Sequence, residues 1–177
     1  RFYRISFTTK PMQKLSIAIH GGAGTILPSE MTAEKEAAYK DALSEALEAG
    51  YKVLATGGSA LNAVEQAVIV LENCPLFNAA KGAVFNSIGG HEMDASIMEG
   101  LHKMAGAVCG VHNIKNPVSL ARQVMEQSEH VLLMGEGAMD FAATIGFPFI
   151  DDDYFYDDFR YQQWLKIKDS EQFQLDH

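Results

Sequence analysis

A glycine-rich run follows the first apolar segment of the chain and offers the first candidate for chemistry. The segment KLSIAIH (14–20) alternates large apolar residues with small or polar ones, which is the period of a strand, and HGGAG (20–24) follows directly. Backbone N–H groups of such a loop can approach a ligand oxygen, because no side chain stands in the way. The spacing leaves a phosphate cradle, an oxyanion loop and a tight turn open. The chain contains neither phosphate motif, GxxxxGKS/T or GxGxxG, and GGSAL (57–61) lacks the last glycine of a GxSxG nucleophile elbow.

The turn CPLFNAAKG (74–82) is a second candidate. Pro75 ends the helical pattern that precedes it, so several carbonyl oxygens there are left without helical partners. Main-chain oxygens suit a hard cation, and a site that needs no carboxylate favours a monovalent one. The alternative interpretation is an ordinary helix end whose carbonyls bind water.

The other groups of metal-binding residue types lack the required spacing. His91-Glu92 has Ala95 where a zinc-binding helix needs its second histidine, and the aspartates of 151–158 lack the glycine and distal glutamate of a calcium loop. These aspartates predict a solvated face. Cys74 and Cys109 are too far apart for a metal-binding CxxC pair and too few for a disulfide framework, which predicts two buried free thiols.

The remaining patterns predict the elements that position these residues. Helices are expected from a Thr32 cap to Gly57 and from a Ser59 cap to Asn73, and Asn116 and Pro117 are expected to cap and open a third. Between them the period changes to that of short strands, followed by a connection over 146–156 with the least pattern of all. The expected strands are 83–85, 92–98, 103–111 and 131–134, and the later helices are 116–127, 137–145 and 157–168. Strands and helices in one piece predict a layered α+β architecture.

Composition excludes several classes of function. The chain has 177 residues, with 14 basic and 23 acidic side chains and a net charge of −9, which argues against a nucleic-acid-binding surface. Its longest apolar runs are far too short to span a bilayer. Residues 1–13 are basic and aromatic, without the apolar core of a signal peptide, and are interpreted as an N-terminal extension. The sequence therefore predicts a cytoplasmic protein. The alternative is an exported protein, with the extension as the end of a leader.

Five motifs in a fixed order carry a resemblance to a known family. They are HGGAG (20–24), LENCPLFNAAKGAVFN (71–86), HEMDASIMEG (91–100), AGAVCGV (105–111) and NPVSLARQVMEQSEHVLLMGEGA (116–138). In order and spacing they resemble the α subunit of plant-type L-asparaginases, also called isoaspartyl peptidases. The resemblance runs from about residue 14 to the end of the chain.

The resemblance implies a fold and a partner. Members of this family are N-terminal nucleophile hydrolases with a four-layer αββα sandwich, of which residues 14–177 would supply about half. A separate β subunit from the same precursor would complete it, in an (αβ)₂ heterotetramer, after the precursor cuts itself before a threonine. The threonines of this chain lie outside the matching context, at positions 8, 9, 25, 32, 56 and 144. A half-sandwich exposes sheet edges and apolar faces, so the chain is predicted to be unstable without the β subunit.

The resemblance also implies a reaction. The first residue of the β subunit, a threonine, would attack the amide carbonyl of L-asparagine or of a β-aspartyl dipeptide, with its own α-amine as the base. Asn78 would lie beside this nucleophile, and Gly21 and Gly22 would form the loop behind it. No organic cofactor is implied, but a structural sodium ion is. Its ligands would be the main-chain carbonyls of Leu71, Glu72, Cys74, Phe77, Ala79 and Lys81.

One departure and two alternatives belong with this interpretation. The family commonly has glycine where this chain has Ala80, so a positive φ there would strain the turn. A glycosylasparaginase-like amidohydrolase would share the fold and the nucleophile. An uncleaved homologue would instead have a binding or structural role.

Overall fold

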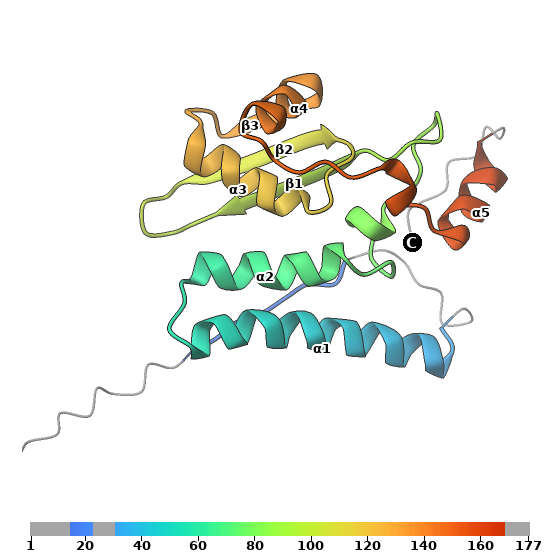
Figure 1. Cartoon of the computed structure of the whole chain (residues 1–177). Coiled ribbons are helices and arrows are strands. Elements are labelled where there is room, and N and C mark those ends of the chain that lie inside the picture. Colours follow the sequence, from blue (N-terminus) through green and yellow to red (C-terminus); the bar gives the residue numbers. More distant parts are fainter. Residues whose placement is uncertain (1–14, 23–30, 169–177) are drawn as a thin grey trace, which may run out of the picture.

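The computed structural model describes residues 15–22 and 31–168. Its two largest parts are a long helix pair and a small sheet with its covering helices, and the last helix lies to one side of them (Figure 1). The elements in chain order are α1 (Ala33–Ala55), α2 (Ala60–Glu72), η2 (Ala80–Gly82), β1 (Met93–Met98), β2 (Ala105–Val111), α3 (Pro117–Gln127), β3 (Leu132–Met134), α4 (Gly135–Thr144), η3 (Asp152–Tyr154) and α5 (Asp158–Ile167).

The helix pair begins where the capping residues predict. The Thr32 hydroxyl accepts the Lys35 N–H at 3.2 Å, and the Ser59 hydroxyl accepts the Asn62 N–H at 3.1 Å, so both predicted N-caps are confirmed. The helices lie close together at Gly50, which is buried. A side chain there would lie only 2.8 Å from the Ala63 carbonyl oxygen. The glycine therefore allows the two helices to pack backbone against backbone.

The sheet has the order β1-β2-β3. β1 pairs with β2 antiparallel, with Ser96 opposite Ala107, and β2 pairs with β3 parallel, with Cys109 opposite Met134. These strands confirm the predictions for 92–98, 103–111 and 131–134. A helix covers one face of the sheet, since α3 packs on both β1 and β2.

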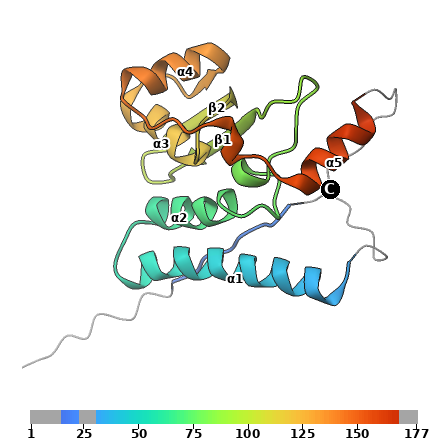
Figure 2. The ribbon, with the colours of Figure 1, turned by 45° about the vertical axis from the view of Figure 1, so that its right-hand side comes forward.

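Two predicted strands do not form in the described part of the chain. Over 83–85 the backbone groups are used locally, because the Val84 N–H donates to the side chain of Asn78 and the Asn86 N–H to the Gly90 carbonyl. Residues 15–20 of the predicted strand 14–20 run across the helix pair instead (Figures 1 and 2), while Lys14 lies outside the described residues. A strand needs a hydrogen-bonded neighbour, and β1, β2 and β3 pair only with one another.

The core lies between α3 and the sheet, and it reaches the connection over 146–156. Val108, Leu120 and Val124 are almost completely buried there. Phe155 is also fully buried, and the Ile150 N–H donates to the Asn113 carbonyl at 2.9 Å. The expectation of an unpatterned, loose connection is therefore wrong, because long-range contacts that leave no periodic pattern hold it.

The two cysteines are free but only partly buried, so the prediction of buried thiols is wrong. Cys109 lies on the face of β2 opposite the core, and Cys74 lies in the turn after α2. No helix of the described residues is long and apolar enough to cross a membrane.

Candidate functional site

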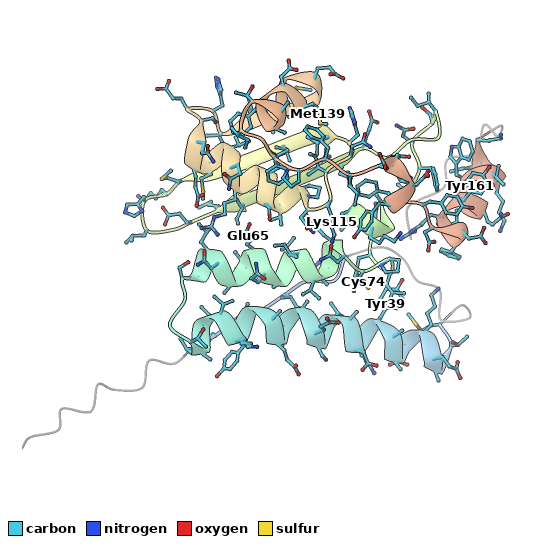
Figure 3. The ribbon with its side chains drawn as sticks, in the orientation of Figure 1. Tyr39, Glu65, Cys74, Lys115, Met139 and Tyr161 are labelled. Atoms are coloured by element: carbon cyan, nitrogen blue, oxygen red, sulfur yellow. The ribbon has the colours of Figure 1, made fainter. Side chains whose placement is uncertain are left out.

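A side chain of α1 holds the turn that follows α2. Figure 3 shows Tyr39, Cys74 and Lys115 gathered at the C-terminal end of α2, where the helix pair meets the sheet module. The Tyr39 hydroxyl donates to the Leu76 carbonyl at 3.1 Å, and its ring meets that of the buried Phe77 edge-on, with centroids 5.6 Å apart. An aromatic anchor on a long helix thus fixes the position of the residue before Asn78.

Asn78 closes the turn with its own side chain. Its Oδ1 accepts the Val84 N–H at 3.1 Å, across the short helix η2. The side chain is exposed at this surface, next to the buried Phe77. Asn78 therefore lies at the surface of the described chain while its side-chain oxygen holds the turn.

The glycine pair lies beside this turn, although more than fifty residues separate the two in sequence. A side chain added at Gly21 would lie 2.8 Å from Leu43 and 3.4 Å from the Phe77 ring. Gly22 has φ +109°, which only glycine adopts readily, and its N–H donates to the His20 imidazole at 3.2 Å. The structure thus brings Gly21, Gly22 and the Asn78 turn together, whereas Ala23 and Gly24 of the same loop lie outside the described residues.

The carbonyls of the turn form a close cradle. A side chain at Gly82 would overlap the carbonyl oxygens of Phe77 and Pro75, so both oxygens converge over this glycine. Pro75 was not among the carbonyls expected from the sequence. Of the six that were, those of Leu71, Phe77 and Ala79 accept the N–H groups of Cys74, Ala79 and Gly82. A carbonyl oxygen has two lone pairs, so those of Phe77 and Ala79 can accept one hydrogen bond and still bind a cation. The Leu71 carbonyl also accepts the Asn73 N–H.

This cradle fits a hard cation better than a transition metal. Within the described residues, no group of three or more His, Cys, Asp or Glu side chains is placed to hold a metal. The oxygens that converge over Gly82 are main-chain carbonyls, a ligand type that hard cations such as sodium accept. Ala80, in the middle of the turn, has φ +44° and is buried, so the strain expected for alanine at this position is present.

The side chain of Glu72 has a role that the sequence did not reveal. It is 3% exposed, and its Oε1 accepts the Val118 N–H at 2.8 Å, capping the first turn of α3. Burial raises the pKa of the carboxyl to about 7, although the hydrogen bond from Val118 favours the charged form. Asn116, the predicted cap, makes no capping bond and donates to Asn73 instead, at 3.2 Å. No local motif could have shown a cap supplied by another helix.

The aspartates of 151–158 largely form the solvated face that the sequence predicts. Asp151, Asp152, Asp153 and Asp158 are exposed, and Asp157 is half-buried. Two of the five also make specific contacts. Asp152 places its Oδ1 3.1 Å from Nδ1 of the buried His91, and Asp157 caps α5 by accepting the Arg160 N–H at 3.1 Å. His91 is thus a buried partner of the Asp152 carboxylate.

Comparison with known proteins identifies the family of this chain. A family model described as asparaginase matches residues 12–177. An isoaspartyl peptidase of Salmonella typhimurium is 49% identical over 94% of this chain and 53% of its own length, and that of Escherichia coli is 48% identical over 94% and 52%. A plant-type L-asparaginase of Pyrococcus abyssi is 46% identical over 88% of this chain and 48% of its own length. The chain thus spans about half the length of the curated relatives it matches, and it belongs to the asparaginase family.

Proposed function

We propose that this chain is the α half of an N-terminal nucleophile amidohydrolase that cleaves isoaspartyl peptides and L-asparagine. One observation carries the proposal: Gly21 lies against the ring of Phe77, the neighbour of Asn78 and distant from Gly21 in sequence, in a chain whose relatives are named for these activities. The nucleophile would come from the other half of the protein, the β subunit.

The reaction proceeds in two steps. The threonine hydroxyl adds to the side-chain carbonyl of the substrate while its α-amine takes the proton. An α-amine has an ordinary pKa near 8, so it is partly neutral at physiological pH and serves as a base without a large shift. The carbon–nitrogen bond then breaks, the amine or ammonia leaves with a proton, and water hydrolyses the ester to release aspartate. Asn78 orients the nucleophile or the water, with the Gly21–Gly22 loop behind them.

The open face of the sheet supports a sandwich completed by the β subunit. Opposite the core, the sheet presents Ser96, Met98, Leu132 and Met134, all exposed, with the small residues Ala105 and Ala107 between them. A flat, mostly apolar face of this kind packs well against a second sheet. The four-layer αββα arrangement and the (αβ)₂ assembly follow from this proposal, with residues 14–177 as the α subunit and 1–13 as an extension.

The carbonyl cradle after α2 is proposed to hold a sodium ion. The ion would neutralise converging carbonyl dipoles and so order the turn, with no part in bond breaking. A cytoplasmic location is proposed on the composition of the chain.

Intact mass under denaturing conditions, with N-terminal sequencing of every component, tests the function in the complete protein. We expect a second chain that begins with threonine, and release of aspartate from β-aspartyl dipeptides and L-asparagine. Cleavage of glycosylated asparagine alone would move the assignment to a glycosylasparaginase. A single uncut species that releases no aspartate would refute the catalytic proposal.

A further inference from the structure

The connection after α4 is tied to the sheet module at its first end. Ile150 and Asn113 exchange two hydrogen bonds, since the Ile150 N–H donates to the Asn113 carbonyl and the Asn113 side-chain amide donates to the Ile150 carbonyl, both at 2.9 Å. Asn113 adopts φ +57°, a conformation that asparagine tolerates better than most residues. This end of the connection is therefore fixed by a specific pair.

Its middle is tied to the residues before β1. The His91 side chain is 1% exposed, and its Nδ1 lies 3.1 Å from Oδ1 of Asp152. Phe155, also fully buried, has its ring centroid 5.8 Å from that of His91. A carboxylate and an aromatic ring of the same segment thus contact the same histidine.

Its far end is tied to the turn after α2 through Lys81. The ammonium group of Lys81 donates to the carbonyl of Tyr154 and, at 3.4 Å, to that of Tyr156. It also lies 4.9 Å from the centroid of the Tyr154 ring, within the range of a cation–π contact. Main-chain carbonyls more than seventy residues away therefore fix the side chain of a residue in η2.

Lys81 lies inside the loop that Asn78 closes. The bond from the Val84 N–H to Asn78 Oδ1 spans residues 78–84, and η2 is the middle of that span. A displacement of η2 would therefore move both ends of this bond. The orientation of the Asn78 amide depends on where Lys81 is held.

We propose that residues 150–156 act as a brace for the turn after α2, and that Lys81 is a positioning residue that sets the orientation of Asn78. The mechanical part concerns this chain alone, and its catalytic consequence rests on the proposed function. Lys81 contacts neither substrate nor nucleophile in this role. It links the turn to the segment that the buried side chains of Phe155 and His91 anchor in the core.

Hydrogen exchange in the complete protein tests the mechanical part. Three variants are compared with the wild type: Lys81→Met, which loses the donors, Lys81→Arg, which keeps them, and Lys115→Met. Lys115 is a matched control, because it is exposed and its ammonium group lies 5.5 Å from the same Tyr154 ring. We expect the Val84 amide to exchange about 10-fold faster in Lys81→Met, and within ~3-fold of wild type in the other two. Amides of β2 should be unchanged in all three.

The opposite patterns would overturn the brace. Unchanged exchange at Val84 in Lys81→Met would show that Lys81 does not hold the turn. An equal increase at Val84 and in β2 would show a general loss of stability and no specific positioning.

Steady-state kinetics test the catalytic consequence. In Lys81→Met we expect kcat to fall about 10-fold with KM changed less than ~2-fold, because a misplaced Asn78 affects the reacting group more than substrate binding. Lys81→Arg should recover most of kcat, and Lys115→Met should match the wild type. An active wild type with unchanged kcat in Lys81→Met would overturn the positioning role. An inactive wild type would instead refute the proposed function. Hydrogen exchange at Val84 would still show whether Lys81 holds the turn.

Discussion

At the scale of single residues, Ala80 is the clearest case of local strain. It is buried with φ +44°, a left-handed conformation that costs an L-residue with a Cβ roughly 1–2 kcal/mol. Ala83 is a matched control, since it is 3% exposed in the same core but has φ −57°. Both substitutions by glycine lose one buried methyl group, and only Ala80→Gly also relieves strain. We expect Ala80→Gly to have a free energy of unfolding about 1 kcal/mol higher than that of Ala83→Gly. Urea denaturation of the complete protein measures both, and equal values would mean that the turn is unstrained.

Glu72 makes stability depend on pH. Its pKa in the folded protein, about 7, lies above the ordinary value of 4.5, so the folded state binds the proton more tightly than the unfolded chain. Its contribution to stability is therefore fully present below pH 4.5 and lost as the pH rises through about 7. Glu72→Gln keeps an oxygen for the Val118 N–H and does not titrate. We expect the stability of Glu72→Gln relative to wild type to rise by ~2 kcal/mol between pH 5 and pH 8.

This measurement needs buffers with choline in place of sodium, because a bound cation near the carboxylate would lower its pKa. Glu48→Gln, on the exposed surface of α1, is the control. Parallel pH curves for Glu72→Gln and wild type would show that the carboxyl does not titrate with a raised pKa.

At the scale of elements, the sequence predicted those features that interactions between neighbouring residues determine. The caps at Thr32 and Ser59 placed the starts of α1 and α2, because a hydroxyl that accepts an N–H three residues on is a local interaction. The prediction of a strand over 14–20 was wrong for its described residues, 15–20. A strand depends on a hydrogen-bonded neighbour, which no local pattern reveals. The contacts of Glu72 with Val118 and of Lys81 with Tyr154 escaped prediction for the same reason. At the site, the sequence singled out the glycine pair and Asn78, and the structure supplied the side chains that hold them.

The open sheet face makes an element-scale prediction. Ala107 lies at its centre, between Ser96 and Leu132 in the register. If a second sheet covers this face, Ala107→Glu buries an unpaired charge, whereas Ala143→Glu adds the same charge on the exposed side of α4. We expect Ala107→Glu to lower the thermal midpoint of the complete protein by ~10 °C or more, or to prevent its assembly, and Ala143→Glu to shift it by less than ~2 °C. Equal small shifts for the two variants would show that the face remains in water.

At the scale of the whole molecule, large apolar side chains of the described residues are exposed in more than one place. Besides the sheet face, a groove of about 530 Å³ opens between the start of α2, the β1–β2 turn and the end of α3, and Val64, Met98, Leu101 and Met104 line it. Leu101 is 83% exposed and Met134 66% exposed. Contiguous exposed apolar patches promote association with other surfaces.

The chain expressed alone should therefore differ from the chain expressed with the proposed β half. We expect the isolated chain to enhance the fluorescence of an apolar dye such as ANS strongly and to unfold over a broad temperature range, because a face meant for burial remains in water. Co-expression with the β half should abolish dye binding and give a sharp transition. Dye binding and calorimetry on both preparations make the comparison, with Met134→Lys as a variant that reduces dye binding in the isolated chain. A sharp, dye-free transition of the isolated chain would show that its own contacts suffice, and the half-sandwich would then be an independent domain.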